Sequence, residues 1–147
     1  MLSLDANILF YAADNTAGAR HRTAKQIVDD ATVVGAALSE QVLFEFFHAS
    51  TRKNKITATD AGAVVRTLLQ NFILILPHNT VVEDAFALIS QHQLSIWDAR
   101  LLAVCDAHGC SHLLSEDMQD GARYGGVTVL NPFRASNAAL IWRALSP

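Results

Sequence analysis

The chain has 147 residues, of which 51% are hydrophobic and 17% are charged. This composition excludes a disordered chain and predicts one ordinary domain, residues 1–147, with a packed core. The formal net charge of −3 excludes the strongly basic proteins that coat nucleic acids. It leaves open a metal site built from carboxylates that acts on nucleic acid.

Membrane and secretion signals are absent from the sequence. No apolar run reaches the roughly 18 residues of a membrane span, and the N-terminus lacks the basic and then apolar pattern of a secretory signal. The two cysteines, Cys105 and Cys110, have no C-x-x-C spacing and indicate reduced thiols. We therefore expect a cytoplasmic protein that makes no contact with membranes.

Strand and helix patterns alternate along the chain. In chain order they predict a strand at 1–4, a helix at 21–30, a strand at 32–38, a helix at 40–52, a helix at 57–72, a strand at 72–76, helices at 80–92 and 96–108, strands at 110–114 and 127–130, and a closing helix at 138–145. The continuously apolar run at 72–76 is typical of a strand buried on both faces. Val64, Val65, Leu68 and Leu69 are the expected inner face of the helix at 57–72. Strands separated by helices predict an α/β fold with a parallel sheet covered on both faces.

Four acidic residues lie where such a fold carries its chemistry. Asp5 follows the first strand and Asp117 follows the strand at 110–114, so both are expected at the carboxyl edge of the sheet. Asp98 lies in the first turn of its helix and could reach that edge. Glu45 borders the apolar face of its helix and has no Lys or Arg three or four positions away, although a buried carboxylate is unfavourable without compensation.

Each acid also has a purely structural interpretation. Asp5 could cap a helix or make an Asx turn. Ser95 and Asp98 match a capping box, and Asp117 lies in a polar turn. The basic run Arg52-Lys53-Asn54-Lys55 is either the solvated end of a helix or a contact surface for RNA.

Convergence of these carboxylates would predict a divalent metal. The negative charges would repel one another and raise their pKa values, and Mg²⁺ or Mn²⁺ would remove that penalty. Such a metal supports hydrolysis of a phosphodiester bond. Phosphate-binding loops, dinucleotide-binding glycine motifs and nucleophile elbows are absent. All three lysines lie in the first half of the chain, which excludes phosphoaspartate chemistry of the dehalogenase or receiver type.

Four segments in this order resemble the PIN-domain family, and more narrowly the VapC-type toxins of toxin–antitoxin pairs. They are the strand leading into Asp5-x-Asn7, the segment Ser39 to Phe46 with Glu45, Ser95-Ile96-Trp97-Asp98-Ala99, and Leu114-Ser115-Glu116-Asp117. The resemblance implies a three-layer α/β/α fold around a parallel sheet. It further implies an endoribonuclease dependent on Mg²⁺ or Mn²⁺, a homodimer, and a cognate antitoxin as partner.

Carried over by position, the resemblance assigns catalytic roles to Asp5, Glu45, Asp98 and Asp117. Asp5 and Asp98 would bind the metal directly, and Asp117 and Glu45 would complete the site through water molecules. Asn7 and Ser115 match the residues that support these acids, and Asp120 or Glu116 is a further candidate for that role. Two alternatives stay open at this point: a catalytically silent binding module, and a nuclease that uses the same acids on DNA or a structured flap.

Overall fold

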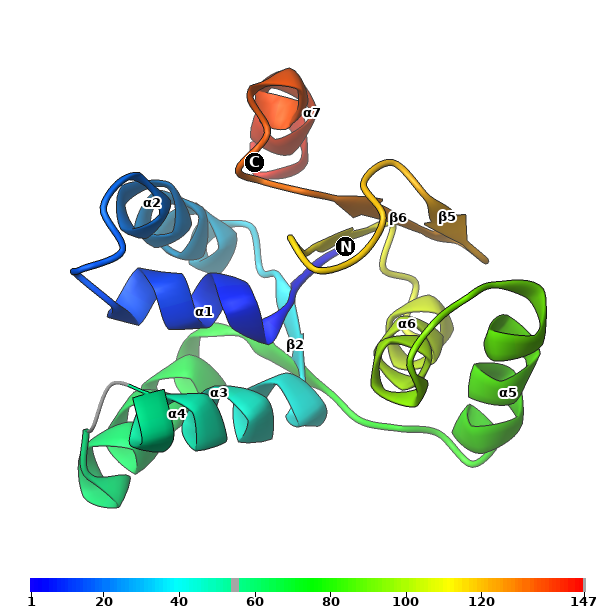
Figure 1. Cartoon of the computed structure of the whole chain (residues 1–147), viewed down its shortest axis with the longest axis horizontal. Helices are drawn as coiled ribbons and strands as arrows, with labels where there is room; N and C mark the ends of the chain where they lie inside the picture. Colours follow the sequence, from blue (N-terminus) through cyan, green and yellow to red (C-terminus); the bar gives the residue numbers. More distant parts are fainter. Residues whose placement is uncertain (54–55, 147) are drawn as a thin grey trace.

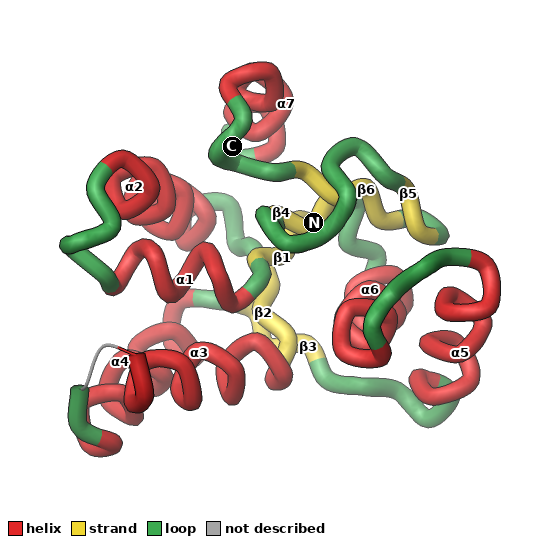
Figure 2. Tube along the Cα trace, viewed as in Figure 1, coloured by secondary structure: helices red, strands yellow, loops and turns green. Residues whose placement is uncertain are grey.

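The structure, a computed structural model, describes residues 1–53 and 56–146 (Figure 1, Figure 2). Its strands are β1 (Leu2–Leu4), β2 (Ala37–Ser39), β3 (Ile73–Ile75), β4 (His112–Leu114), β5 (Arg123–Tyr124) and β6 (Val127–Leu130). Its helices are α1 (Ala6–Ala13), α2 (Ala19–Val33), α3 (Glu40–Lys53), α4 (Ala58–Asn71), α5 (Val81–Gln91), α6 (Ile96–Ala107) and α7 (Ala138–Ala144), the last preceded by the 3₁₀ turn η1 (Ala135–Asn137).

The six strands form one sheet in the order β3-β2-β1-β4-β6-β5. All neighbours are parallel except β5, which runs antiparallel to β6. From β1 the chain moves outward through β2 to β3, then returns to the other side of β1 to add β4 and β6. Open α/β sheets bind their ligands at such a reversal, beyond the carboxyl ends of the two central strands. Here those ends belong to β1 and β4.

Helices cover both faces of the sheet. Figure 1 shows α1 to α4 on one side and α5 and α6 on the other. Within these layers, α1 contacts α2 and α3, α3 contacts α4, and α5 contacts α6. Buried apolar residues from the strands and from α1, α2, α3, α4, α6 and α7 form one core cluster. The predicted three-layer α/β/α arrangement is confirmed, and none of the described helices is long and apolar enough to cross a membrane.

Most predicted elements match the structure within a few residues, and three corrections are needed. The sequence pattern predicts no helix before residue 21, so it missed α1, which has Asp5 as its N-cap. It placed the second strand at 32–38, whereas α2 continues to Val33 and the chain turns at Gly35, with φ of 68°, before β2 begins. It also missed β5, a strand of two residues.

The interpretation of 72–76 as a strand buried on both faces is wrong. Because β3 is an edge strand of the sheet, Ile73 is 50% exposed and Leu74 is 42% exposed. The inner face of α4 is likewise narrower than predicted, because Leu68 is buried whereas Val64 and Leu69 are exposed. Both errors come from assigning every apolar position to the core.

The hairpin that joins β5 to β6 requires glycine. Gly125 has φ of 58°, and a Cβ atom there would lie 2.4 Å from Oδ2 of Asp106. The next residue, Gly126, donates its backbone N–H to Oδ1 of Asp106 at 2.9 Å. Two-residue hairpins favour positive φ, so this glycine pair has a structural role at the edge of the sheet.

Candidate active site

Asp5 lies at the switch point between β1 and β4. Its backbone N–H donates to the carbonyl of Leu114, the last residue of β4, at 2.9 Å. Its side-chain Oδ1 accepts the N–H of Ala6 at 2.7 Å and so caps α1. The residue is only 7% exposed. The capping interpretation is therefore correct, and it fixes this carboxylate at the edge where ligands bind.

Asn7 and Ser115 join Asp5 to Asp117. The Asn7 amide donates to Oδ2 of Asp5 at 3.1 Å and to Oδ2 of Asp117 at 3.0 Å. The Ser115 hydroxyl donates to Oδ2 of Asp5 at 2.6 Å and accepts the backbone N–H of Asp117 at 3.2 Å. Two carboxylates from segments more than 100 residues apart are thus held together by neutral donors.

Burial raises the pKa of Asp5 to about 6. Desolvation penalises the charged form, and the negative charges of Glu45 and Asp117 add to the effect. Hydrogen bonds from Ser115 and from the Ala6 N–H act in the opposite direction. The Asp5 carboxylate is therefore close enough to Glu45 and Asp117 to be disfavoured by their charges.

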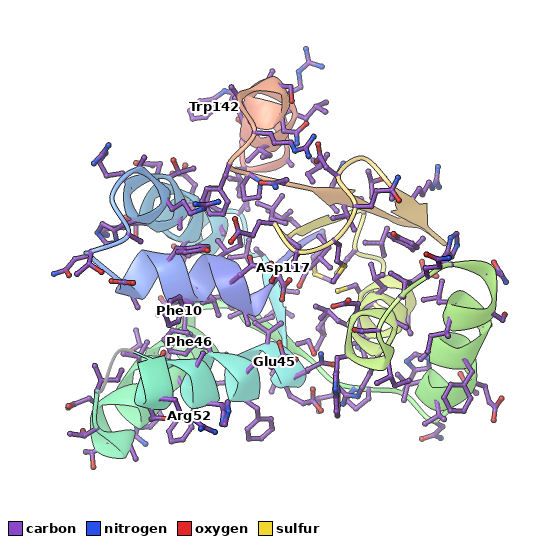
Figure 3. The ribbon with its side chains drawn as sticks, in the orientation of Figure 1. Phe10, Glu45, Phe46, Arg52, Asp117 and Trp142 are labelled. Atoms are coloured by element: carbon purple, nitrogen blue, oxygen red, sulfur yellow. The ribbon has the colours of Figure 1, made fainter. Side chains whose placement is uncertain are left out.

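Glu45 lies on α3 and is half-buried. Figure 3 labels Glu45 on α3 and Asp117 near the N-terminal end of α1. Both residues lie in the central region of the molecule, between the two groups of helices. Oε1 of Glu45 accepts the Gln41 amide at 2.8 Å, and the same amide nitrogen donates to the Trp97 carbonyl at 3.1 Å. Gln41 therefore ties Glu45 to the first turn of α6.

Asp98 follows Trp97 in that first turn and is half-buried. The Ser95 hydroxyl accepts the Asp98 N–H at 3.0 Å, which confirms the predicted N-cap. Among the residues that the structure describes, none makes a hydrogen bond or ion pair with the Asp98 carboxylate. The side chain is therefore available for another partner.

The four acids lack compensating cations. Asp5, Glu45, Asp98 and Asp117 form no salt bridge within residues 1–53 and 56–146, whereas five other acidic side chains do. Arg100, two residues after Asp98, forms a salt bridge with Glu40 instead. Nη2 of Arg100 lies 2.6 Å from Oε1 of Glu40. Negative charge that is partly buried and unpaired is unfavourable without a cation or a proton.

The donor chemistry of this cluster fits a hydrated Mg²⁺ or Mn²⁺ ion. All the available donors are oxygens, and the buried Oδ1 of Asn7 accepts no hydrogen bond within the described residues. The described part of the chain contains no preformed group of three or more His, Cys, Asp or Glu ligands. Mg²⁺ keeps several waters and needs only one or two direct carboxylates, so a site with few protein ligands suits it.

Glu116 and Asp120 make their contacts away from the four acids. Glu116 accepts the Tyr11 hydroxyl and pairs with Nε of Arg20 at 3.2 Å, and the Glu116 hydrogen bond raises the pKa of Tyr11. Asp120 instead accepts the Asn131 N–H at 2.8 Å and the Asn137 amide at 2.7 Å. Asp120 thus joins the loop after β4 to the segment after β6, and this structure gives it no contact with Asp5 or Asp117.

Arg52 is exposed on α3, seven residues after Glu45. Two helical turns separate the residues, which places them on the same face of α3 and about 10 Å apart along its axis. Figure 3 shows both labels along this helix. The Lys53 side chain and Lys55 lie outside the described residues.

Gln41 and Arg100 are the site residues that sequence reasoning missed. Glutamine four positions before Glu45 fits an i,i+4 hydrogen bond, so the spacing could have identified Gln41. The Arg100 guanidinium donates to Oε1 of Gln41 at 2.7 Å. That contact joins two helices more than 50 residues apart, and no local pattern signals it.

Comparisons with known proteins agree with this geometry. Residues 2–120 match the sequence family described as the PIN domain. Comparison with curated protein sequences finds no significant match. Among solved structures, the chain is similar to VapC20 of Mycobacterium tuberculosis, described as a toxin that cleaves the sarcin–ricin loop, with 19% identity, TM-score 0.61, and coverage of 77% of this chain and 87% of that one.

Two toxin–antitoxin assemblies are similar as well. A toxin–antitoxin complex from Klebsiella pneumoniae aligns with 24% identity and TM-score 0.65 over 90% of this chain and 98% of the other. VapBC2 of Rickettsia felis, bound to a DNA fragment from its promoter, aligns with 13% identity and TM-score 0.63 over 87% and 96%. At these identities the likeness shows the fold alone, which this chain shares with these proteins.

Proposed function

The chain belongs to the PIN-domain family, and from that premise we propose that it is a metal-dependent endoribonuclease and the toxin of a toxin–antitoxin pair. The observation that carries the proposal is the group of acids at the switch point of the sheet. Asp5, Glu45 and Asp117 interact electrostatically, Asp98 lies next to the Gln41 bridge, and none of the four has a cationic partner among the described residues. A divalent cation would compensate this unpaired negative charge and would itself bind a phosphodiester substrate.

Mg²⁺ or Mn²⁺ bound here would offset charge on the phosphodiester and favour ionisation of a water nucleophile. Asp5 and Asp98 are the proposed direct ligands, because Asp5 is rigidly held and the Asp98 carboxylate is free. Glu45 and Asp117 would orient water molecules through their oxygens. Attack on the phosphorus in line with the leaving oxygen gives a 3′-hydroxyl and a 5′-phosphate.

Asn7 and Ser115 are the proposed supporting residues. The Asn7 amide donates to the carboxylates of both Asp5 and Asp117. The Ser115 hydroxyl donates to the Asp5 carboxylate, and its oxygen accepts the backbone N–H of Asp117. Fixed carboxylates lose little freedom when a cation binds, which favours a preorganised site. Asp120 has a stabilising role under this proposal, because its contacts are with Asn131 and Asn137.

RNA is the proposed substrate, a tRNA or rRNA loop in particular. Arg52 would contact the phosphate backbone on one side of the acids, and Lys53 and Lys55 are further RNA contacts predicted from the sequence alone. The mycobacterial neighbour, described as cleaving the sarcin–ricin loop, supports an RNA target. Such a substrate and the reduced state expected of the buried, unpaired cysteines support action in the cytoplasm.

An antitoxin protein and a second copy of the chain are the proposed protein partners. The neighbours from Klebsiella and Rickettsia are toxin–antitoxin complexes, which supports the antitoxin. Exposed apolar side chains on and after β3 and on α5 support a homodimer, because large exposed apolar residues favour protein contacts. They are Leu74, Leu76, Val82 and Phe86.

The test is cleavage of RNA by the purified chain with Mg²⁺ or Mn²⁺. We expect hydrolysis that stops with a chelator and that Asp5→Asn and Asp98→Asn abolish while both variants stay folded. Asp29→Asn is the matched control, because Asp29 is an exposed acid that pairs with Lys25 on α2. Unchanged RNA hydrolysis by Asp5→Asn would rule out this mechanism.

Two other results would replace the proposal. Equal or faster cleavage of single-stranded or flap DNA would favour a DNA nuclease with the same site. No cleavage of any nucleic acid, together with no stabilisation of the fold by Mn²⁺, would favour the silent binding module.

A further inference from the structure

A groove of about 610 Å³ opens beside Glu45, between α3 and the first turn of α6. Its walls include Phe44, His48, Trp97 and Arg100. Glu45 itself lines the groove, so the groove shares one wall residue with the four acids. A substrate whose reacting phosphate lies at the acids therefore has this groove as a neighbouring space.

Two large aromatic rings line the groove and face solvent. Phe44 is 73% exposed and Trp97 is 61% exposed. Each directly precedes one of the proposed acids, Phe44 before Glu45 and Trp97 before Asp98. Large exposed aromatic rings beside a polar site indicate a surface that binds a ligand or another macromolecule.

Hydrogen bonds hold the backbones that carry these rings in fixed relation. The Gln41 amide donates both to the Trp97 carbonyl at 3.1 Å and to Glu45 at 2.8 Å. Arg100 in turn donates to Gln41 and Glu40. The same contacts that position Glu45 against α6 therefore position Phe44 and Trp97 on either side of the groove.

One of the two acids in the groove wall is neutralised within the protein. Glu40 is neutralised by Arg100 at 2.6 Å, so it does not repel a phosphate backbone. Glu45 is the remaining acid of the wall, and the proposed metal site uses it. A nucleobase is neutral and flat, and aromatic side chains are the surfaces on which unpaired bases stack.

We propose that Phe44 and Trp97 form a stacking surface for an unpaired nucleobase next to the scissile phosphate. This inference rests on the proposed ribonuclease function and gives its substrate a specific form, single-stranded RNA with at least one base turned out of any helix. Every base can stack on an aromatic ring. This surface would therefore favour unpaired RNA over paired RNA, and any preference for a particular sequence would come from other contacts.

Fluorescence of Trp97 tests base contact without catalysis. The chain has two tryptophans, and Trp142→Phe leaves Trp97 as the sole one. In EDTA, a single-stranded RNA of twelve nucleotides should quench its emission saturably. An abasic oligomer of the same length should not, because it carries phosphates without bases. Equal quenching by both oligomers, or none by either, would overturn the proposal.

Kinetics tests the consequence for cleavage. Phe44→Leu and Trp97→Leu should each raise KM for single-stranded RNA about tenfold with kcat changed less than twofold. Both residues are exposed, so these variants keep the core intact. Trp142→Leu is the matched control, because Trp142 is 68% exposed on α7, at a distance from Glu45 in Figure 3, and its KM should not change.

The outcomes separate this inference from the proposed function. If both leucine variants cleave RNA with unchanged KM, stacking is wrong and the nuclease assignment stands. If they instead convert a dimer into monomers in sedimentation analysis while KM for RNA stays unchanged, the rings belong to an interface between copies and the inference is wrong. If the unaltered chain cleaves no RNA while RNA still quenches Trp97 selectively, the nuclease assignment fails and base binding stands.

Discussion

Replacing Asp5 with asparagine removes the most buried ionisable group of the candidate site. The carboxyl group is 7% exposed and its pKa is raised to about 6. Asparagine has nearly the same shape and can still accept the Ala6 N–H. The substitution therefore changes the charge at the end of β1 while leaving the backbone contacts in place.

The pKa shift fixes the size and sign of the effect on stability. A rise from 3.8 to about 6 corresponds to about 3 kcal/mol, at 1.36 kcal/mol per pKa unit. Because the folded-state pKa lies above the unfolded value, the stabilisation is fully present below pH 3.8. It is lost as the pH rises through 6, where folding requires a buried charge. Metal-free protein should thus lose about 3 kcal/mol across this range from Asp5 alone.

Urea denaturation in EDTA at several pH values between 4 and 7.5 measures this contribution. The free energy of unfolding of the Asp5→Asn variant minus that of the unaltered chain should increase by about 2.4 kcal/mol from pH 4 to pH 7, since a small part of the total is already lost at pH 4. Any loss of a hydrogen bond from Ser115 or Asn7 shifts the difference equally at every pH, so the pH dependence isolates the charge. A difference that stays constant over this range would refute the reasoning that burial and neighbouring acids disfavour the Asp5 carboxylate.

Three further predictions follow from contacts around the site. Saturating Mn²⁺ at pH 7 should raise the melting temperature by roughly 5–10 °C, measured by calorimetry, and Asp5→Asn should lose most of that increase; an equal increase in the variant would place the metal elsewhere. Asp120→Ala should destabilise the fold by about 1–3 kcal/mol, since it removes the acceptor of two donors, while its kcat on RNA stays within twofold; a large loss of kcat would return Asp120 to the site. Ser95→Ala should cost about 1 kcal/mol of stability by removing the N-cap of α6, whereas Ser95→Thr should retain most of it in the same denaturation assay.

The sequence was informative where local chemistry decides the structure. Ser95 begins α6 as the predicted capping box requires, because its hydroxyl accepts the Asp98 N–H. The hydroxyls of Ser39 and Thr57 accept an N–H of the first turn in the same way. The parallel sheet follows from alternating strands and helices. That logic also brought Asp5 and Asp117 to one edge from positions more than 100 residues apart, and the hydrogen bonds of Asn7 and Ser115 bear out their proximity.

Tertiary context decided what the sequence could not show. Ile73 and Leu74 have the composition of a buried strand, yet their exposure depends on β3 being last in the sheet, which no local pattern states. In the sequence Asp120 looks like another acid of the site. In the structure its Oδ1 accepts hydrogen bonds from Asn131 and Asn137, which lie 11 and 17 residues further along the chain. Which carboxylates bind a metal directly stays a prediction. The distance between Glu45 on α3 and Asp98 on α6 depends on how these two helices pack, and no local sequence pattern determines that packing.

Manganese in a crystal of the full chain tests the central claim most directly. Mn²⁺ scatters anomalously, so its position can be found independently of the protein density. We predict one peak in direct contact with carboxylate oxygens of Asp5 and Asp98, with Glu45 and Asp117 within reach through water. Saturating Mn²⁺ with no peak among these four side chains would contradict the claim that they hold a cation.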